Sequence, residues 1–129
     1  MTTNIPSSMT AIEISEPGKP NVLKPSTRKV PEPKEHEILI KIAAAGVNGP
    51  DLVQRRGHYP PPKGATDLLG LEVAGEVVAA GKNVTQWIIG DQVCGLTNGG
   101  GYAQYVAADA THFLPVPQKL DLVEAASLP

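Results

Sequence analysis

Glycine and proline divide this chain into short segments, and this division limits the fold more than any other feature of the sequence. Thirteen glycines and thirteen prolines make up about a fifth of the 129 residues, against a usual share of roughly 12%. Glycine weakens a helix and proline interrupts it. The sequence therefore predicts a mainly β domain of short strands and turns, with short helices only.

The composition is that of a globular protein and narrows the choice of partners. Hydrophobic residues make up 41% and charged residues 19%, and the net charge is −2. This balance indicates neither nucleic-acid nor anionic-membrane binding. No apolar run approaches the roughly 20 residues of a membrane helix, and residues 1–8 lack the features of a signal peptide. We therefore expect one cytoplasmic domain with no nucleic-acid and no membrane partner.

Apolar alternation and turn residues place the predicted strands. Residues 1–8 are small and polar and predict a flexible tail, and the domain is expected to span residues 9–120. Regularly spaced short strands with glycine-containing turns are typical of a compact antiparallel barrel. The predicted strands are 9–14, 22–30, 37–45, 68–80, 92–94, 102–107 and 112–116.

Residues 47–57 predict a helix of two turns between a strand and a proline-rich loop. Asn48 or Gly49 can act as the N-cap, and Asp51 suits the positive end of the helix. The Asn48 side chain can instead project into a crevice at the strand-to-helix junction. Tyr59, in the rigid loop that follows, can either cover the barrel end or face the same crevice.

A second helix start lies at the end of the chain. Residues 121–124, Asp-Leu-Val-Glu, match the pattern of a capping box. We expect either a helix that cannot bury its apolar face, as in a protein cut from a longer one, or a short terminal helix docked on the barrel.

The glycine-rich segments do not match phosphate-binding motifs. Residues 75–83 have five residues between the glycines where a P-loop has four, and Asn83 replaces its Ser or Thr. Gly99 and Gly101 are correctly spaced for a dinucleotide motif, but Gln104 stands in the third glycine position. The sequence therefore predicts turns at these glycines.

Several ordered segments resemble the quinone oxidoreductases, the zeta-crystallin-like branch of the medium-chain dehydrogenase/reductase superfamily. The resemblance covers residues 9–129 and implies a GroES-like catalytic domain, a distorted β-barrel with short helices. The Rossmann domain that follows in this family is absent from the chain, and residues 121–129 would begin the helix leading to it. The matching segments include AAGVNGPDLVQR at 44–55, GHYPPP at 57–62 and LGLEVAGEV at 69–77.

The resemblance implies hydride transfer from NADPH to a quinone or another enone. Asn48 and Tyr59 match catalytic positions with hydrogen-bonding or orienting roles, and Asn48, Gly49 and Asp51 match cofactor-binding positions. The fragment alone is expected to be inactive because nothing in it holds the pyrophosphate, and the full-length protein is expected to be a homodimer. The alternatives are a stand-alone GroES-like module for binding or oligomerisation and, with less support, a co-chaperonin.

The resemblance also implies the zinc-independent branch of the superfamily. In zinc-dependent relatives, a Cys and a His ligand occupy the positions aligned with Asn48 and Leu71. The Cys-rich lobe that binds structural zinc is missing between Cys94 and Tyr102. The single cysteine and the histidines at 36, 58 and 112 are widely separated, a spacing that indicates no metal site, and we expect Cys94 to be a small buried side chain.

Overall fold

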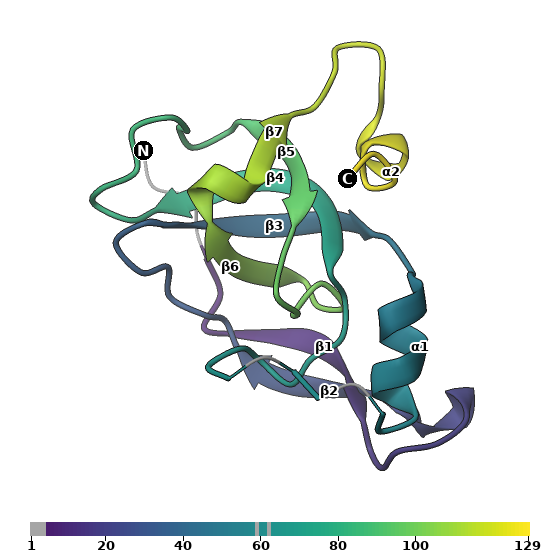
Figure 1. The fold of residues 1–129 in the computed structure, drawn as a ribbon. Helices are drawn as coiled ribbons and strands as arrows, with labels where there is room; N and C mark the ends of the chain where they lie inside the picture. Colours follow the sequence, from purple (N-terminus) through teal and green to yellow (C-terminus); the bar gives the residue numbers. More distant parts are fainter. Residues whose placement is uncertain (1–4, 59, 62) are drawn as a thin grey trace.

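Two antiparallel sheets make up most of the chain in the computed structural model, which describes residues 5–58, 60–61 and 63–129. One is a five-stranded sheet in the order β6-β3-β4-β5-β7, and the other is the β1-β2 hairpin below it (Figure 1). The predicted mainly β class is confirmed. The elements are β1 (Ser8–Ile14), η1 (Pro20–Val22), β2 (Leu23–Lys29), β3 (Glu37–Ala45), α1 (Gly49–Arg55), β4 (Glu72–Ala80), β5 (Gln92–Leu96), β6 (Tyr105–Asp109), η2 (Ala110–His112), β7 (Phe113–Pro115) and α2 (Leu122–Ala125).

Strand β3 carries the core on both of its faces. Ile38 and Ile40 are fully buried in one apolar cluster, together with residues of β4, β5 and β6. Leu39 points the opposite way and packs with Met9 of β1 and with Val30, the residue after β2. The predicted alternation along β3 is therefore present, and the hairpin buries the second face.

The hairpin is joined to the five-stranded sheet by backbone hydrogen bonds as well as by apolar contacts. The Ile12 N–H donates to the Tyr102 carbonyl at 2.9 Å, and the Gln104 N–H donates to the Thr10 carbonyl at 3.2 Å. These bonds close one side of the barrel just before β6 begins.

Two strands, β4 and β6, begin three or more residues later than the sequence predicts, and glycine explains both shifts. Residues 68–71 precede β4 without joining it, because Gly70 has a φ of 102° and lies against the Gly101 backbone. The predicted strand at 102–107 begins at Tyr105, because the turn that contains Gly99 and Gly100, both with positive φ, extends further along the chain.

The terminal helix α2 is docked on the barrel. Ala125 and Ala126 are 0% and 3% exposed and pack against Ala74 and Cys94, as expected of a terminal helix docked on the barrel. Val123 and Leu128 are 69% and 54% exposed, so this terminal segment buries its alanines and leaves these two larger apolar side chains uncovered. Four residues suffice because alanine side chains fit closely against the sheet. The predicted capping box is present, with the Glu124 N–H donating to Asp121 Oδ1 at 2.8 Å. Within the described ranges, every helix is too short or too polar to cross a membrane.

The close approach of β3 and β4 at Gly75 gives a stability prediction. A Cβ at Gly75 would overlap the Lys41 carbonyl of the neighbouring strand, which cannot move without breaking the sheet. We expect Gly75→Ala to lower the free energy of unfolding by about 1–3 kcal/mol in urea denaturation.

Gly49→Ala is the matched control for Gly75→Ala. Its Cβ would meet nothing within 4 Å, and alanine is the better helix former by up to about 1 kcal/mol. Equal stabilities of the two variants would contradict the packing argument.

Candidate functional site

Asn48 is the N-cap residue of α1, as one of the predicted alternatives has it, and its side chain also reaches beyond the helix. Asn48 and Asp51 have the arrangement of a capping box, in which Asp51 Oδ2 accepts from the Asn48 N–H at 3.1 Å. The Asn48 side chain faces the Asp51 N–H in the capping-box arrangement without making a cap hydrogen bond, and that N–H donates to the Asn48 backbone carbonyl at 3.1 Å. The Asn48 Nδ2 donates instead to Glu72 Oε1 at the start of β4, at 3.2 Å. The interpretation of Asn48 as a plain helix cap is therefore incomplete.

Asp51 is the most buried charged side chain of this region, at 2% exposure. Its Oδ2 also accepts a hydrogen bond from the Tyr102 hydroxyl at 2.8 Å. Its Oδ1 is buried and has no partner among the described residues. A buried acceptor without a donor is uncommon and marks a place for a water or a ligand donor.

The Tyr102 hydroxyl stabilises the Asp51 carboxylate by donating a hydrogen bond to it. Burial, and then the hydrogen bond to the Asp51 carboxylate, raise the pKa of the Tyr102 hydroxyl. The hydroxyl is therefore protonated at neutral pH and donates to Asp51. We call the four residues joined by these hydrogen bonds the Asn48 cluster: Asn48, Asp51, Glu72 and Tyr102.

Glu72 places a second carboxylate in the cluster and affects a nearby thiol. Its residue exposure is 7%. Burial, and secondarily the charge of Glu72, raise the pKa of Cys94. Cys94 is 1% exposed, so the expectation of a small buried side chain is confirmed, and a protonated buried thiol is not a nucleophile.

The structure brings three of the four predicted site residues together. Asn48, Gly49 and Asp51 share the first turn of α1, and Tyr59 lies outside the described residues. Glu72 and Tyr102 were missed by the sequence analysis. The one signal for Glu72 was a charge within the apolar run at 69–75, and Tyr102 follows three glycines with no further mark.

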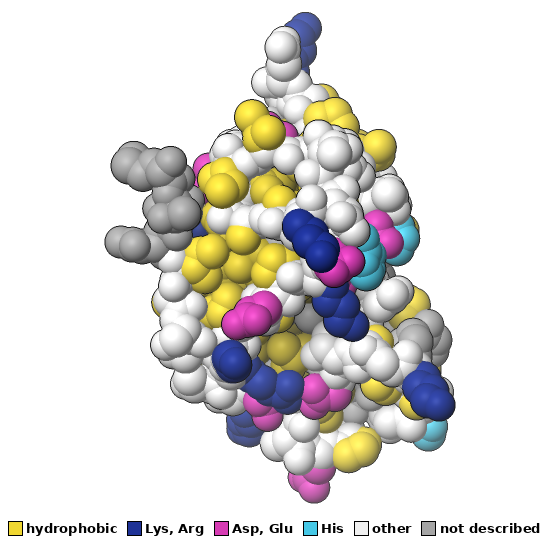
Figure 2. Space-filling view, turned by 90° about the vertical axis from the view of Figure 1, so that its left-hand side faces the viewer, with side chains coloured by type: hydrophobic (Ala, Val, Ile, Leu, Met, Phe, Trp, Pro, Cys, Tyr) yellow, Lys and Arg dark blue, Asp and Glu magenta, His cyan; other side chains and the backbone are white. Residues whose placement is uncertain are grey.

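No group of three or more His, Cys, Asp or Glu side chains converges on a metal-sized site within the part of the chain that the structure describes. On the face drawn in Figure 2, lysine and arginine side chains are interspersed with carboxylates beside a gathering of hydrophobic ones.

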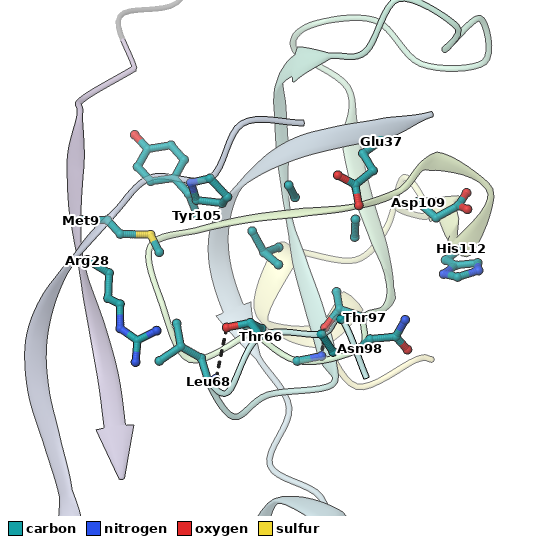
Figure 3. A pocket seen from close by; sticks show the side chains of 18 of the residues that line it. Met9, Arg28, Glu37, Thr66, Leu68, Thr97, Asn98, Tyr105, Asp109 and His112 are labelled. Carbon is teal, nitrogen blue, oxygen red and sulfur yellow. Dashed lines mark hydrogen bonds between the residues drawn. The ribbon is translucent and has the colours of Figure 1, made fainter. Parts of the chain in front are cut away.

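A separate pocket of about 360 Å³ lies beside β6, and its lining includes no member of the Asn48 cluster. Figure 3 shows Met9, Arg28 and Leu68 at one end and Asp109 and His112 at the other. Its size suits a small molecule, and its lining mixes apolar and charged side chains.

Arg28 holds one wall of this pocket in place. Its guanidinium contacts Glu13 at 2.6 Å and pairs with both oxygens of Asp67 at 2.8 and 2.9 Å. The Asp67 carbonyl in turn accepts from Gln54 Nε2 of α1 at 3.1 Å. These bonds tie the hairpin, the segment before β4 and α1 to one another. Arg28 holds the pKa of Asp67 below its ordinary value.

The alcohol dehydrogenase GroES-like domain family matches residues 34–118 of this chain. Because the match covers more than half of the residues, the chain belongs to this family. The resemblance to quinone oxidoreductases is confirmed by curated relatives. The quinone oxidoreductase of Lama guanicoe is 42% identical over 123 residues, and that of Homo sapiens is 40% identical over the same length.

The matched relatives are much longer than this chain. The alignments cover 93% of the chain and 37% of each of these two quinone oxidoreductases. The solved structure of the quinone oxidoreductase from Coxiella burnetii has a TM-score of 0.85 at 34% identity, over 95% of this chain and 41% of that one. The human synaptic vesicle membrane protein VAT-1 homolog-like protein has a TM-score of 0.88 at 31% identity, over 96% and 40%.

The Tyr102–Asp51 hydrogen bond gives a prediction for the site. Tyr102→Phe removes a donor from a buried carboxylate that already has one oxygen without a described partner. We expect the free energy of unfolding to fall by about 1–3 kcal/mol, measured by urea denaturation. Tyr105→Phe, in a different apolar cluster, is the control; an equal loss in both variants would show that the loss of a tyrosine hydroxyl as such, and not of the bond to Asp51, is responsible.

The Arg28–Asp67 pair predicts a pH-dependent stability. Because the folded pKa of Asp67 lies below its ordinary value of 3.8, the pair stabilises the fold above that pH, and the effect is lost as the pH falls through the folded pKa. The Asp67 side chain is 69% exposed, so the effect is less than about 1 kcal/mol.

The measurement is the melting temperature of wild type and Asp67→Asn from pH 7 to about pH 2, below the ordinary carboxyl range. We expect wild type to melt higher at pH 7 and the difference to vanish at the acid end. The difference should also shrink in roughly 1 M NaCl, because salt screens exposed charges. A difference that stays constant with pH would contradict an ionic contribution.

Proposed function

We propose that this chain is the N-terminal catalytic domain of an NADPH-dependent quinone oxidoreductase, which transfers a hydride from NADPH to a quinone or another enone. The observation that carries the proposal is the 42% identity to a quinone oxidoreductase, maintained over 93% of the chain. The alignment includes the segment at the start of α1 from which the site residues come.

The Asn48 cluster fits a nucleotide at this position. Asn48 is an exposed residue at the start of α1, and the Asp51 Oδ1 is a buried acceptor with no donor among the described residues. Ribose hydroxyls and the nicotinamide carboxamide are donors of the required kind. NADPH, when bound, supplies the hydride.

The proposed roles follow from these positions. Asn48 orients the ligand by hydrogen bonding, and Gly49, which has open space where a Cβ would stand, leaves room for it. Asp51 binds near the cofactor and holds the Asn48 backbone. Tyr59 is proposed as the second catalytic residue on the family resemblance alone.

The domain assignment and the absence of zinc are part of the proposal. The proposed division is a tail at 1–8, of which Ser8 already belongs to β1, a catalytic domain at 9–120, and a segment at 121–129 that packs on this domain through α2 and leads to a dinucleotide-binding domain that holds the pyrophosphate. The chain alone is then inactive, and the full-length protein is a cytoplasmic homodimer. An amide and an aliphatic side chain, Asn48 and Leu71, are not zinc ligands, so the reaction is proposed to be zinc-independent.

The experiment is a chimera in which this chain replaces the aligned segment of the Lama guanicoe quinone oxidoreductase. We expect the chimera to oxidise NADPH in the presence of 1,4-benzoquinone, followed by the loss of NADPH absorbance, and the chain alone to give no turnover. Asn48→Ala in the chimera is expected to lower kcat/KM about a hundredfold, because small errors in ligand position cost rate steeply.

Lys82→Gln, at an exposed ion pair of the surface, is the control and should leave the rate unchanged. A chimera that folds by circular dichroism and binds NADPH but reduces no quinone would contradict the proposal. That result would favour a GroES-like binding module without catalysis.

A further inference from the structure

Glu72 is a buried carboxylate with no cationic partner among the described residues. The described residues form three ion pairs, and Glu72 takes part in none of them. Its exposure is only 7%. Burying a carboxylate without compensation is costly. The hydrogen bond from Asn48 Nδ2, at 3.2 Å, is the compensation that the structure provides.

The space for this carboxylate depends on Gly46. A Cβ at Gly46 would overlap Glu72 Oε1, and the Gly46 N–H donates to the Glu72 carbonyl at 2.8 Å. The backbone therefore holds Glu72 beside the end of β3, which lies three residues before Asn48 in the chain. The sheet thus fixes the backbone of Glu72, and Gly46 leaves the space that its carboxylate occupies.

The pairing determines which way the Asn48 amide faces. An ionised carboxylate only accepts hydrogen bonds, whereas an asparagine amide has a donor nitrogen and an acceptor oxygen. Only the orientation with Nδ2 toward Glu72 makes a hydrogen bond, and the oxygen then lies on the other side of the amide.

The Asn48 oxygen keeps acceptor capacity in this orientation. It faces the first turn of α1 in the capping-box arrangement but makes no cap hydrogen bond to the described helix. The Asp51 N–H donates instead to the Asn48 backbone carbonyl at 3.1 Å. Because an amide oxygen has two lone pairs, at least one is available to a ligand beside this exposed residue.

We propose that Glu72 is a positioning residue that holds the Asn48 amide with its Oδ1 available to the ligand, so that this site selects a ligand group that donates a hydrogen bond. The identity of the ligand rests on the function proposed above. A quinone carbonyl is an acceptor and would not suit Asn48 Oδ1. The nicotinamide carboxamide, a ribose hydroxyl and the hydroxyl of a reduced quinone are donors and would suit it.

The first test uses this chain itself and the side-chain amide signals in a ¹⁵N–¹H spectrum. We expect one Nδ2 proton of Asn48 to be shifted downfield and slowed in exchange with water in wild type, and to lose both features in Glu72→Leu, which has no acceptor. In the exchanged pair N48D/E72Q, the same features should move to the new glutamine amide at position 72, which donates to the new carboxylate at position 48. Asn48 signals typical of a solvent-exposed amide and unaffected by Glu72→Leu would overturn the proposal, whatever the activity of the protein.

The second test measures NADPH oxidation with 1,4-benzoquinone in the chimera. N48D alone places two carboxylates against each other and is expected to lose about tenfold or more in kcat/KM. N48D/E72Q restores the hydrogen bond in the opposite sense while still presenting an oxygen at position 48. We therefore expect it to recover to within about threefold of wild type.

The outcomes distinguish this inference from the proposed function. If N48D/E72Q melts like wild type but is as poor as N48D, Asn48 acts as a donor toward the ligand and the inference is wrong. If the wild-type chimera itself reduces no quinone, the proposed function fails, and the spectrum of the chain still decides whether Glu72 orients Asn48.

Discussion

The antiparallel pairing of β3 with β4 is the interaction on which the core and the Asn48 cluster both depend. Its register sets Ala45 opposite Val73, so the next residues outward, Gly46 and Glu72, meet at the same end of the sheet. Glycine at position 75 permits the two backbones to approach closely within the pair. The start of α1 and the start of β4 are therefore held together by backbone hydrogen bonds before any side chain of the cluster contributes.

Because Asp51 bonds to the Asn48 N–H at the start of α1, the Asn48 side-chain amide is free to donate a hydrogen bond to a residue outside the helix. In a full capping box the N-cap side chain accepts from the helix while the third helical residue bonds back to the N-cap N–H. Asn48 and Asp51 have this arrangement. The hydrogen bond that forms is the one in which Asp51 Oδ2 accepts from the Asn48 N–H. The Asn48 side-chain nitrogen donates to Glu72 instead. One capping hydrogen bond is enough to stabilise the N-terminus of this short helix, because the negative charge of Asp51 also interacts favourably with the positive end of the helix dipole.

Patterns between neighbouring residues predicted most helices and strands, whereas the hydrogen bonds of the Asn48 cluster join residues far apart in the sequence. The strand at 37–45 and the helix after Asn48 follow from alternation and capping patterns that act within a few residues. The Asn48–Glu72 bond joins residues 24 positions apart, and the Tyr102–Asp51 bond joins residues 51 apart. No spacing rule in a single sequence reaches so far, because the partner of Asn48 depends on the register of the sheet. The docking of α2 was open for the same reason.

The Asn48 cluster and the pocket beside β6 are two separate polar regions that share one rigid wall. The Thr97 hydroxyl, which lines the pocket, donates to the Gly70 carbonyl at 3.0 Å, and the Thr97 N–H donates to the Leu71 carbonyl at 2.8 Å. The next residue is Glu72. Because the backbone of this segment is bonded on the pocket side, a side chain that changes partners in the pocket cannot displace Glu72 without breaking these bonds. The backbone that carries Glu72 is thus held by the sheet and by this wall, and the Glu72 carboxylate in turn orients the Asn48 amide.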